Sequence, residues 1–180
     1  MYPRPVRDLI TAFSKLPSVG TRTAERFVFH LLYSGKRDVA EIILALRQLM
    51  ERMKSCEVCW NFTDQSPCSI CKDPNRDMTT LCIVARPQEV ETLERTGAFR
   101  GRYHVLRGVV EADAEDGGIK ELKIPELVSR IQNGQIQEVI LALNPDMNGE
   151  TTMMLLEKKL REKFPALIVS RLARGLPMGS

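Results

Sequence analysis

The sequence has no long hydrophobic run and few histidines. No apolar stretch approaches the roughly 20 residues of a membrane-spanning helix, and the first residues lack the apolar segment of a signal peptide. These absences predict a soluble, cytoplasmic protein. The two histidines, His30 and His104, have no neighbouring nucleophile, so we expect them to pack or to face solvent rather than to catalyse a reaction.

Positive charge is concentrated at the N-terminus. The 180 residues carry a net charge of +3 and are 43% hydrophobic, enough for a core in one domain or in two small ones. Residues 1–37 carry seven Lys or Arg side chains against Asp8 and Glu25, which gives this segment a charge of +5. Such a segment suits a polyanionic partner, although an ordinary solvated surface can have the same composition.

Four cysteines form two C-x-x-C pairs that are separated by eight residues. Four thiolates at about 2.3 Å complete the tetrahedron of a closed structural zinc site, with no position left for substrate. The segment between the pairs is too short and too polar to bury a core, so the metal would replace one. The alternative is a redox pair, which requires a C-x-x-C at a helix start in a βαβ pattern. The predicted ligands are Cys56, Cys59, Cys68 and Cys71.

The fifth cysteine, Cys82, lies in the apolar run of residues 81–84. A buried, reduced thiol is the expected state of a cysteine in such a run. A reducing compartment suits both this thiol and a zinc site.

Apolar periodicity predicts two amphipathic helices over residues 4–16 and 21–34. Between them, Pro17 is expected to end the first helix, Gly20 to adopt unusual backbone angles and Thr21 to cap the second. A third helix is predicted from Asp38 to residue 53, with Glu41 completing a capping box.

The connection between the first two helices is the candidate for nucleic-acid contact. Unpaired backbone N–H groups at a helix start favour an anion, and basic side chains flank this turn. Contacts of this kind bind the phosphate backbone and do not read base sequence. A hairpin that merely packs, with its arginines in solvent, is the alternative. The candidate DNA-binding residues are Lys15, Val19, Gly20, Thr21, Arg22 and Arg26.

From Met78 onward, short apolar runs alternate with helical patterns, which predicts an open, mostly parallel α/β sheet. The acidic segment Val109–Gly118 is expected to be a surface loop. The predicted strands are Thr80–Ala85, Arg102–Leu106, Glu138–Leu143 and Leu167–Leu172, and the predicted helices are Pro87–Thr96, Pro125–Asn133 and Gly149–Lys163.

Several motifs in this order resemble the RecR family of bacterial recombination mediators, over essentially the entire chain. They are LPSVGTRTAER, CEVCWNFTDQSPCSIC, DPNRD, GRYHVL, VILALNPDMNGETT and SRLARGLPMG. The resemblance implies an α+β multi-module fold: a helix-hairpin-helix at residues 1–54, a four-cysteine zinc finger at 55–77 and a Toprim domain at 78–180. The family typically continues beyond Ser180 with a tail that links subunits, so we expect the chain to end at the start of that tail.

The resemblance also implies a function. Members of the family form dimers and ring-shaped tetramers through which DNA can pass, and act with RecO and RecF to load RecA onto gapped DNA coated by single-strand-binding protein. We therefore expect a non-catalytic clamp and adaptor in the bacterial cytoplasm, associated with the nucleoid. The family's DNA-contacting positions fall on Arg22 and Arg26, and Ser18 stands where the family commonly has a glycine.

The Toprim resemblance raises one alternative, a magnesium-dependent enzyme that acts on DNA phosphodiesters. Magnesium requires several hard oxygen ligands. Here Ala85 stands where catalytic Toprim domains carry a glutamate, and Asn144-Pro-Asp146 replaces the usual Asp-x-Asp. Asn144, Asp146 and Glu150 are therefore expected to form a vestigial acidic site that binds partners or holds the fold. A third possibility is a zinc-containing interaction module that does not bind DNA.

Overall fold

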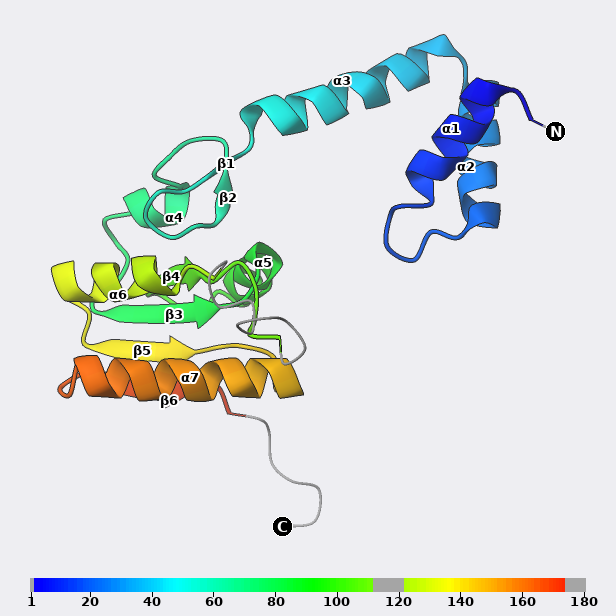
Figure 1. Ribbon diagram of the computed structural model, residues 1–180. Coiled ribbons are helices and arrows are strands. Elements are labelled where there is room, and N and C mark those ends of the chain that lie inside the picture. The colour runs from blue at the N-terminus through cyan, green and yellow to red at the C-terminus, as the bar shows by residue number, and fades with distance from the viewer. Residues whose placement is uncertain (1, 112–121, 174–180) are drawn as a thin grey trace. The chain divides into compact units, whose positions relative to one another are not determined.

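The computed structural model describes residues 2–111 and 122–173. The chain divides into two units, Met1–Met53 and Lys54–Ser180; their elements are labelled in Figure 1. None of the described helices is both long enough and apolar enough to cross a membrane.

The N-terminal unit consists of three helices, α1 (Arg4–Phe13), α2 (Thr21–Ser34) and α3 (Lys36–Arg52). The first two pack through a small core of Ile10, Ala24 and Val28, which come from the predicted apolar faces. The end of α1 at Phe13 is three residues short of the prediction, and residues 14–18 form turns.

The predicted capping box of the third helix is wrong. Gly35 is the N-cap and has φ +90, so α3 begins at Lys36, only two residues after α2 ends. Asp38 therefore lies inside the first turn of α3, and Glu41 instead pairs with Arg37 at 3.4 Å. A glycine with positive φ lets the chain change direction within one residue. The helix therefore begins two residues earlier than predicted, at Lys36 instead of Asp38.

The C-terminal unit begins with the cysteine-containing segment. Two short antiparallel strands, β1 (Lys54–Ser55) and β2 (Phe62–Thr63), are followed by the single turn α4 (Ser69–Lys72). These elements are too short to enclose a core of apolar side chains. Their buried centre consists of the four cysteines.

The rest of this unit is a four-stranded sheet in the order β4-β3-β5-β6 with every pair parallel, as predicted. The strands are β3 (Thr80–Val84), β4 (Arg102–Val105), β5 (Glu138–Leu141) and β6 (Ile168–Arg171). The helices are α5 (Pro87–Thr96), α6 (Ile124–Asn133) and α7 (Met147–Lys163).

Successive side chains of β3 point to opposite faces of the sheet, so they belong to two separate buried clusters. Leu81 and Ile83 belong to the cluster that α6 and α7 cover, whereas Cys82 and Val84 belong to the cluster that receives α5 and the cysteine-containing segment. Burial raises the pKa of Cys82 to about 12, so it is the protonated, buried thiol that the sequence predicted.

The segment Asp73–Asp77 connects the cysteines to the sheet through Arg76. One guanidinium nitrogen donates to Glu94 at 2.9 Å and to the carbonyl of Gly101 at 3.1 Å, and the other also contacts Glu94. Arg76 lowers the pKa of the Glu94 carboxyl, and the Tyr103 hydroxyl donates to the same carboxylate at 2.7 Å. Because these groups are largely buried, the network orders the connection.

The predicted surface loop at Val109–Gly118 is only partly described. Residues 112–118 lie outside the described residues. Val110 is buried in the core, and its N–H donates to the hydroxyl of Thr152 at 2.8 Å. The prediction is therefore wrong for this residue, because the chain enters the core beside α7 before it reaches the acidic stretch.

His104 is fully buried in β4 and is held neutral. Its Nε2 donates to the carbonyl of Lys123 at 2.8 Å, and Nδ1 has no partner among residues 2–111 and 122–173. Burial lowers the pKa of His104 from 6.5 to about 4. A second proton on Nδ1 would bury an N–H without an acceptor.

Acid should therefore destabilise the protein through His104. The depressed pKa means that the unfolded state takes up a proton first as pH falls below 6.5 towards about 4, so stability present above that window is lost within it. Between about pH 7 and about pH 5 the loss is about 2 kcal/mol. His104→Gln, which keeps a donor to Lys123 but cannot be protonated, should remove this component in urea unfolding at the two pH values.

His30→Gln is the matched control, because His30 is exposed. Both variants keep all five cysteines, so proton uptake by metal-binding thiolates affects each protein equally. Identical pH dependence in the wild type and in His104→Gln would contradict the assignment.

Candidate metal centre and nucleic-acid interface

The four predicted cysteines meet at one point. Their sulfur atoms all lie within 4.8 Å of one another and all four residues are buried. Cys59 Sγ and Cys68 Sγ are 3.6 Å apart, close to the separation of about 3.8 Å that two sulfurs on one tetrahedral zinc ion have. Within residues 2–111 and 122–173, this is the only group of three or more His, Cys, Asp or Glu side chains placed to hold a metal.

The backbone turns bring each pair of sulfurs together. After the first pair, the Trp60 N–H donates to the carbonyl of Cys56 at 2.9 Å, with Trp60 itself at φ +63. At the second pair, the Cys68 N–H donates to Cys56 Sγ at 3.3 Å. An amide directed at a sulfur stabilises it as a thiolate ligand.

The packing of the sulfurs suits a cation. The contact between Cys59 and Cys68 raises the pKa of Cys59 and lowers the pKa of Cys68, because two sulfurs this close stabilise one shared proton between them. A zinc ion replaces this proton because it binds all four sulfurs as thiolates.

The cysteine-containing segment is attached to the edge of the sheet. The carbonyl of Cys59 accepts a hydrogen bond from the Val105 N–H of β4 at 2.8 Å. The ammonium of Lys123 lies 4.2 Å from the centre of the Trp60 ring, and Trp60 packs against the core of that face. The segment is therefore a part of the C-terminal unit and does not stand apart from it.

A second contact holds β1 and β2. The Arg107 guanidinium lies 3.9 Å from the centre of the Phe62 ring and donates to the Ser55 hydroxyl at 2.6 Å. Sequence reasoning missed Arg107 and Lys123 because both are far from the cysteines in the chain. Trp60 and Phe62 were visible as aromatic residues beside the cysteine pairs, but their cationic partners were not.

The turn between α1 and α2 differs from its prediction in detail. Ser18, and not Gly20, has the left-handed backbone with φ +64. Gly20 is the N-cap of α2 with an ordinary φ of −79, and Thr21 is the first residue of the helix rather than its cap. A left-handed serine is strained, which is a physical reason for the glycine that the family resemblance leads us to expect at this position.

The start of α2 has the features of an anion site. No described side chain caps it, and its first turn has no acidic residue. A Cβ atom added to Gly20 would meet nothing within 4 Å, so this glycine is not needed for packing and leaves the backbone open to a ligand.

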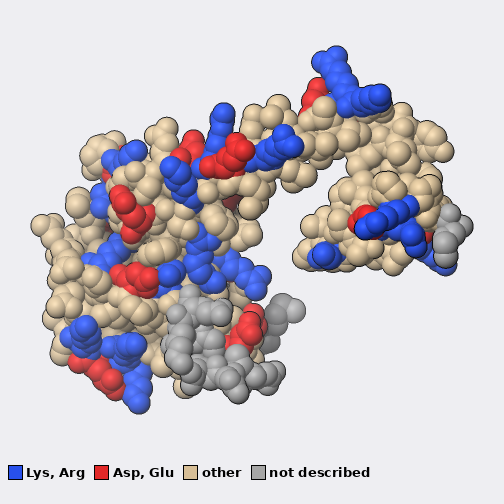
Figure 2. Space-filling view, turned by 45° about the horizontal axis from the view of Figure 1, so that its top comes forward, with Lys and Arg blue, Asp and Glu red and all other residues tan. Residues whose placement is uncertain are grey.

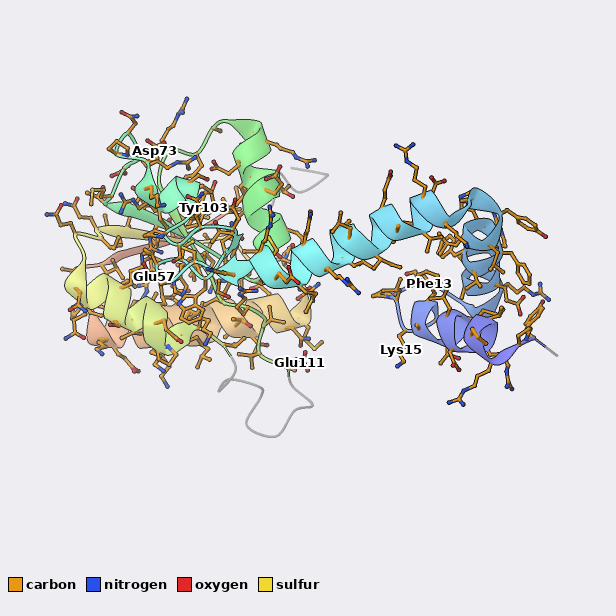
Figure 3. The ribbon with its side chains drawn as sticks, turned by 90° about the horizontal axis from the view of Figure 1, so that it is seen from above. Phe13, Lys15, Glu57, Asp73, Tyr103 and Glu111 are labelled. Atoms are coloured by element: carbon orange, nitrogen blue, oxygen red, sulfur yellow. The ribbon has the colours of Figure 1, made fainter. Side chains whose placement is uncertain are left out.

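The basic side chains beside this turn are exposed. Lys15 lies in the turn after Phe13 (Figure 3), and Arg22 and Arg26 are one helical turn apart on α2. No described acidic group forms a salt bridge with any of the three. In Figure 2, basic side chains outnumber acidic ones on the visible face of the N-terminal unit.

The predicted acidic site lies at the carboxyl end of the parallel strands. Asp146 caps α7 by accepting the Gly149 N–H at 2.7 Å, and Glu150 pairs with Arg171 at 3.3 Å. Asn144 lines a cavity of about 400 Å³ together with Arg171. Asp146 and Glu150 thus have structural partners, the Gly149 N–H and Arg171, whereas Asn144 lines the cavity.

Ala85 lies at the end of β3, where its side chain is buried. Its N–H donates at 2.8 Å to the carboxylate of Glu89 in the first turn of α5. This carboxylate therefore caps the start of α5.

Comparison with known proteins agrees with this architecture. The family model of the RecR helix-hairpin-helix matches residues 6–50, that of the RecR four-cysteine zinc finger domain matches 53–73, and a Toprim domain model matches 79–173. The Recombination protein RecR of Moorella thermoacetica is 43% identical over 181 residues, covering 99% of this chain and 88% of that protein. This chain belongs to the RecR family.

Other members are similarly close. The RecR proteins of Thermobifida fusca and Synechococcus sp. are 42% and 40% identical and cover 99% and 100% of this chain, which spans 88% and 90% of their lengths. The resemblance read from the sequence is thereby confirmed, together with the order of the three domains. The four clustered cysteines are the zinc site of the RecR zinc finger.

Removal of zinc should unfold the segment between β1 and α4, because zinc binding to such sites contributes roughly 10–16 kcal/mol. Cys68→Ser or a strong chelator should expose this segment to protease and loosen β4, to which Cys59 is bonded. Cys82→Ser is the control, since Cys82 is buried outside the cluster and this variant should keep its zinc. Full protease resistance in zinc-free protein would contradict a structural role for the metal.

Proposed function

We propose that this chain is a non-catalytic DNA-binding clamp and adaptor in recombinational DNA repair. The observation that carries the proposal is the exposed, uncapped start of α2 with Lys15, Arg22 and Arg26 beside it, in a chain of the RecR family. The Val19–Thr21 backbone receives a phosphate, and the three cations flank it. Amide and guanidinium donors grip phosphate oxygens and give no preference for base sequence.

The partners follow from the family. The chain acts with RecO and RecF to load RecA onto gapped DNA coated by single-strand-binding protein, in the cytoplasm at the bacterial nucleoid. The proposed partner-binding face is the exposed loop at Asn144 and Asp146. This loop connects β5 to α7. The nearby cavity and the Arg171–Glu150 pair share Arg171, the last residue of β6.

Several observations favour an adaptor over a magnesium-dependent Toprim enzyme. The buried methyl of Ala85 replaces a carboxylate, Asp146 is occupied as a helix cap, and Glu150 is paired with Arg171. Magnesium needs several oxygen ligands directed at one point. Within the described residues, only the cysteines converge in that way.

The DNA contact predicts a specific salt dependence. Arg22→Ala and Arg26→Ala should each lower the slope of log K against log salt concentration by about one unit, because each neutralises about one phosphate. The measurement is fluorescence anisotropy with labelled DNA over a series of salt concentrations. Arg37→Ala removes the same charge from α3, where Arg37 pairs with Glu41, and should leave the slope unchanged.

Binding that persists unchanged in the Arg22→Ala/Arg26→Ala double variant would overturn the site. Magnesium-dependent cleavage of the same DNA would overturn the non-catalytic function and favour the enzyme. Absence of DNA binding at low salt, with zinc bound, would favour an interaction module that does not bind DNA.

The chain is also proposed to form a homodimer or a homotetrameric ring, with α3 in an interface. This helix buries no residue within the chain. Its exposed apolar residues recur at helical spacing, and such a continuous stripe marks an interaction surface. The stripe consists of Ile42, Leu46, Leu49 and Met53, which are 44%, 57%, 55% and 39% exposed.

A charge in this stripe should therefore separate the subunits. Leu46→Glu is expected to reduce the mass measured by light scattering towards 20.4 kDa, the mass of one chain. Gln48→Glu adds the same charge on another side of α3 and should keep the larger mass. Equal masses for the wild type and Leu46→Glu would show that α3 is not an interface.

A further inference from the structure

A row of exposed basic and aromatic side chains runs along α2 from the proposed phosphate-binding site. Arg22 and Arg26 are followed at helical spacing by His30 and Tyr33, so the four side chains share one side of the helix. We call Arg22, Arg26, His30 and Tyr33 the α2 row. Tyr33 is 85% exposed, an unusual position for a large ring in a folded chain.

The second half of the row borders a groove. The groove has a volume of about 530 Å³ and is lined by Arg26, Phe27, Phe29, His30 and Tyr33. The ring of Tyr2 meets the ring of Phe29 edge to face at 5.4 Å between centroids and so packs against one of the residues that line the groove. A cation at one end and aromatic rings along the rest make the groove amphipathic.

We infer that this groove binds the unpaired bases of single-stranded DNA. The inference rests on the proposed function, in which Arg22 and Arg26 hold the phosphate backbone, and it adds the form of DNA that the site prefers. Bases stack on Tyr33 and on the rings that line the groove, while the backbone follows the arginines. Such stacking needs an exposed base face, which a duplex keeps inside its own stack.

The dimensions of the row agree with this arrangement. Arg26 and Tyr33 are separated by about 10 Å along the helix axis, roughly the length of three stacked nucleotides at about 3.4 Å each. The α2 row contains no acidic residue that would repel a phosphate. Glu25, the only acidic residue of α2, lies outside the row and is half-buried. The cation at the groove also distinguishes it from the stripe of α3, which contains only aliphatic residues and methionine.

The charge of the row selects DNA over a second copy of the chain as the occupant. An interface between copies is best served by apolar side chains that face one another, as on α3. Burying Arg26 against an identical surface would bring like charges together without a counter-ion. A DNA strand satisfies both halves of the groove, because it offers a phosphate and an aromatic base in each nucleotide.

The experiment compares an oligothymidine strand with an abasic strand of the same length, which has the same charge but no bases. Fluorescence anisotropy is measured for the wild type, Tyr33→Leu and Tyr33→Phe, with duplex DNA as a third probe. Leu32→Ala is the control, because Leu32 is 60% exposed on the same helix but outside the row. Light scattering on every protein reports its oligomeric state.

We expect the wild type to bind oligothymidine more tightly than the abasic strand. Tyr33→Leu should lose about fivefold to 150-fold in affinity for oligothymidine, the range that stacking of one base gives, and should bind the abasic strand and the duplex as the wild type does. Tyr33→Phe keeps the ring and should bind like the wild type, as should Leu32→Ala.

Equal affinity of the wild type for the two single strands would overturn the inference, as would an equal loss in Tyr33→Leu on all three probes. A smaller mass for Tyr33→Leu, with weaker binding to every probe, would assign the groove to self-association and also overturn it. Failure of the wild type to bind any of the three probes would instead remove the proposed function on which the inference rests.

Discussion

The cysteine-containing segment of the C-terminal unit depends on the neutralisation of four buried sulfurs by one cation. The segment that carries them has two short strands and a single helical turn, and its only buried centre is the cysteine group. A metal therefore does there what an apolar core does elsewhere. The hydrogen bond from the Val105 N–H to the Cys59 carbonyl joins this segment to β4. The metal site and the edge strand of the sheet therefore stabilise one another.

The N-terminal unit is organised in the opposite way, with little core and much exposed apolar and basic surface. Its buried cluster has three residues, and α3 buries none within the chain. Such an exposed apolar surface is costly for an isolated chain. The proposed occupants differ in chemistry: another chain on the aliphatic stripe of α3, and DNA on the cations and rings of α2.

At the carboxyl end of the sheet, acidic side chains hold the backbone at the starts of helices. Glu89 and Asp146 each accept backbone N–H groups at the start of a helix, and Glu150 meets Arg171. Carboxylates used in this way stabilise the loops that follow the strands. The loop at Asn144 remains exposed.

Local patterns in the sequence determined the elements, their order and the zinc ligands, because helix and strand periodicity and the cysteine spacing act over a few residues. The bounds Thr21–Ser34 and Pro87–Thr96 agree with the structure for this reason. Only the tertiary structure decided which strands neighbour one another, where Val110 is buried, and that Arg107 and Lys123 hold the cysteine-containing segment. Those contacts join residues far apart in the chain, and backbone angles such as those of Ser18 and Gly35 depend on how the chain closes its turns, so neither follows from local composition.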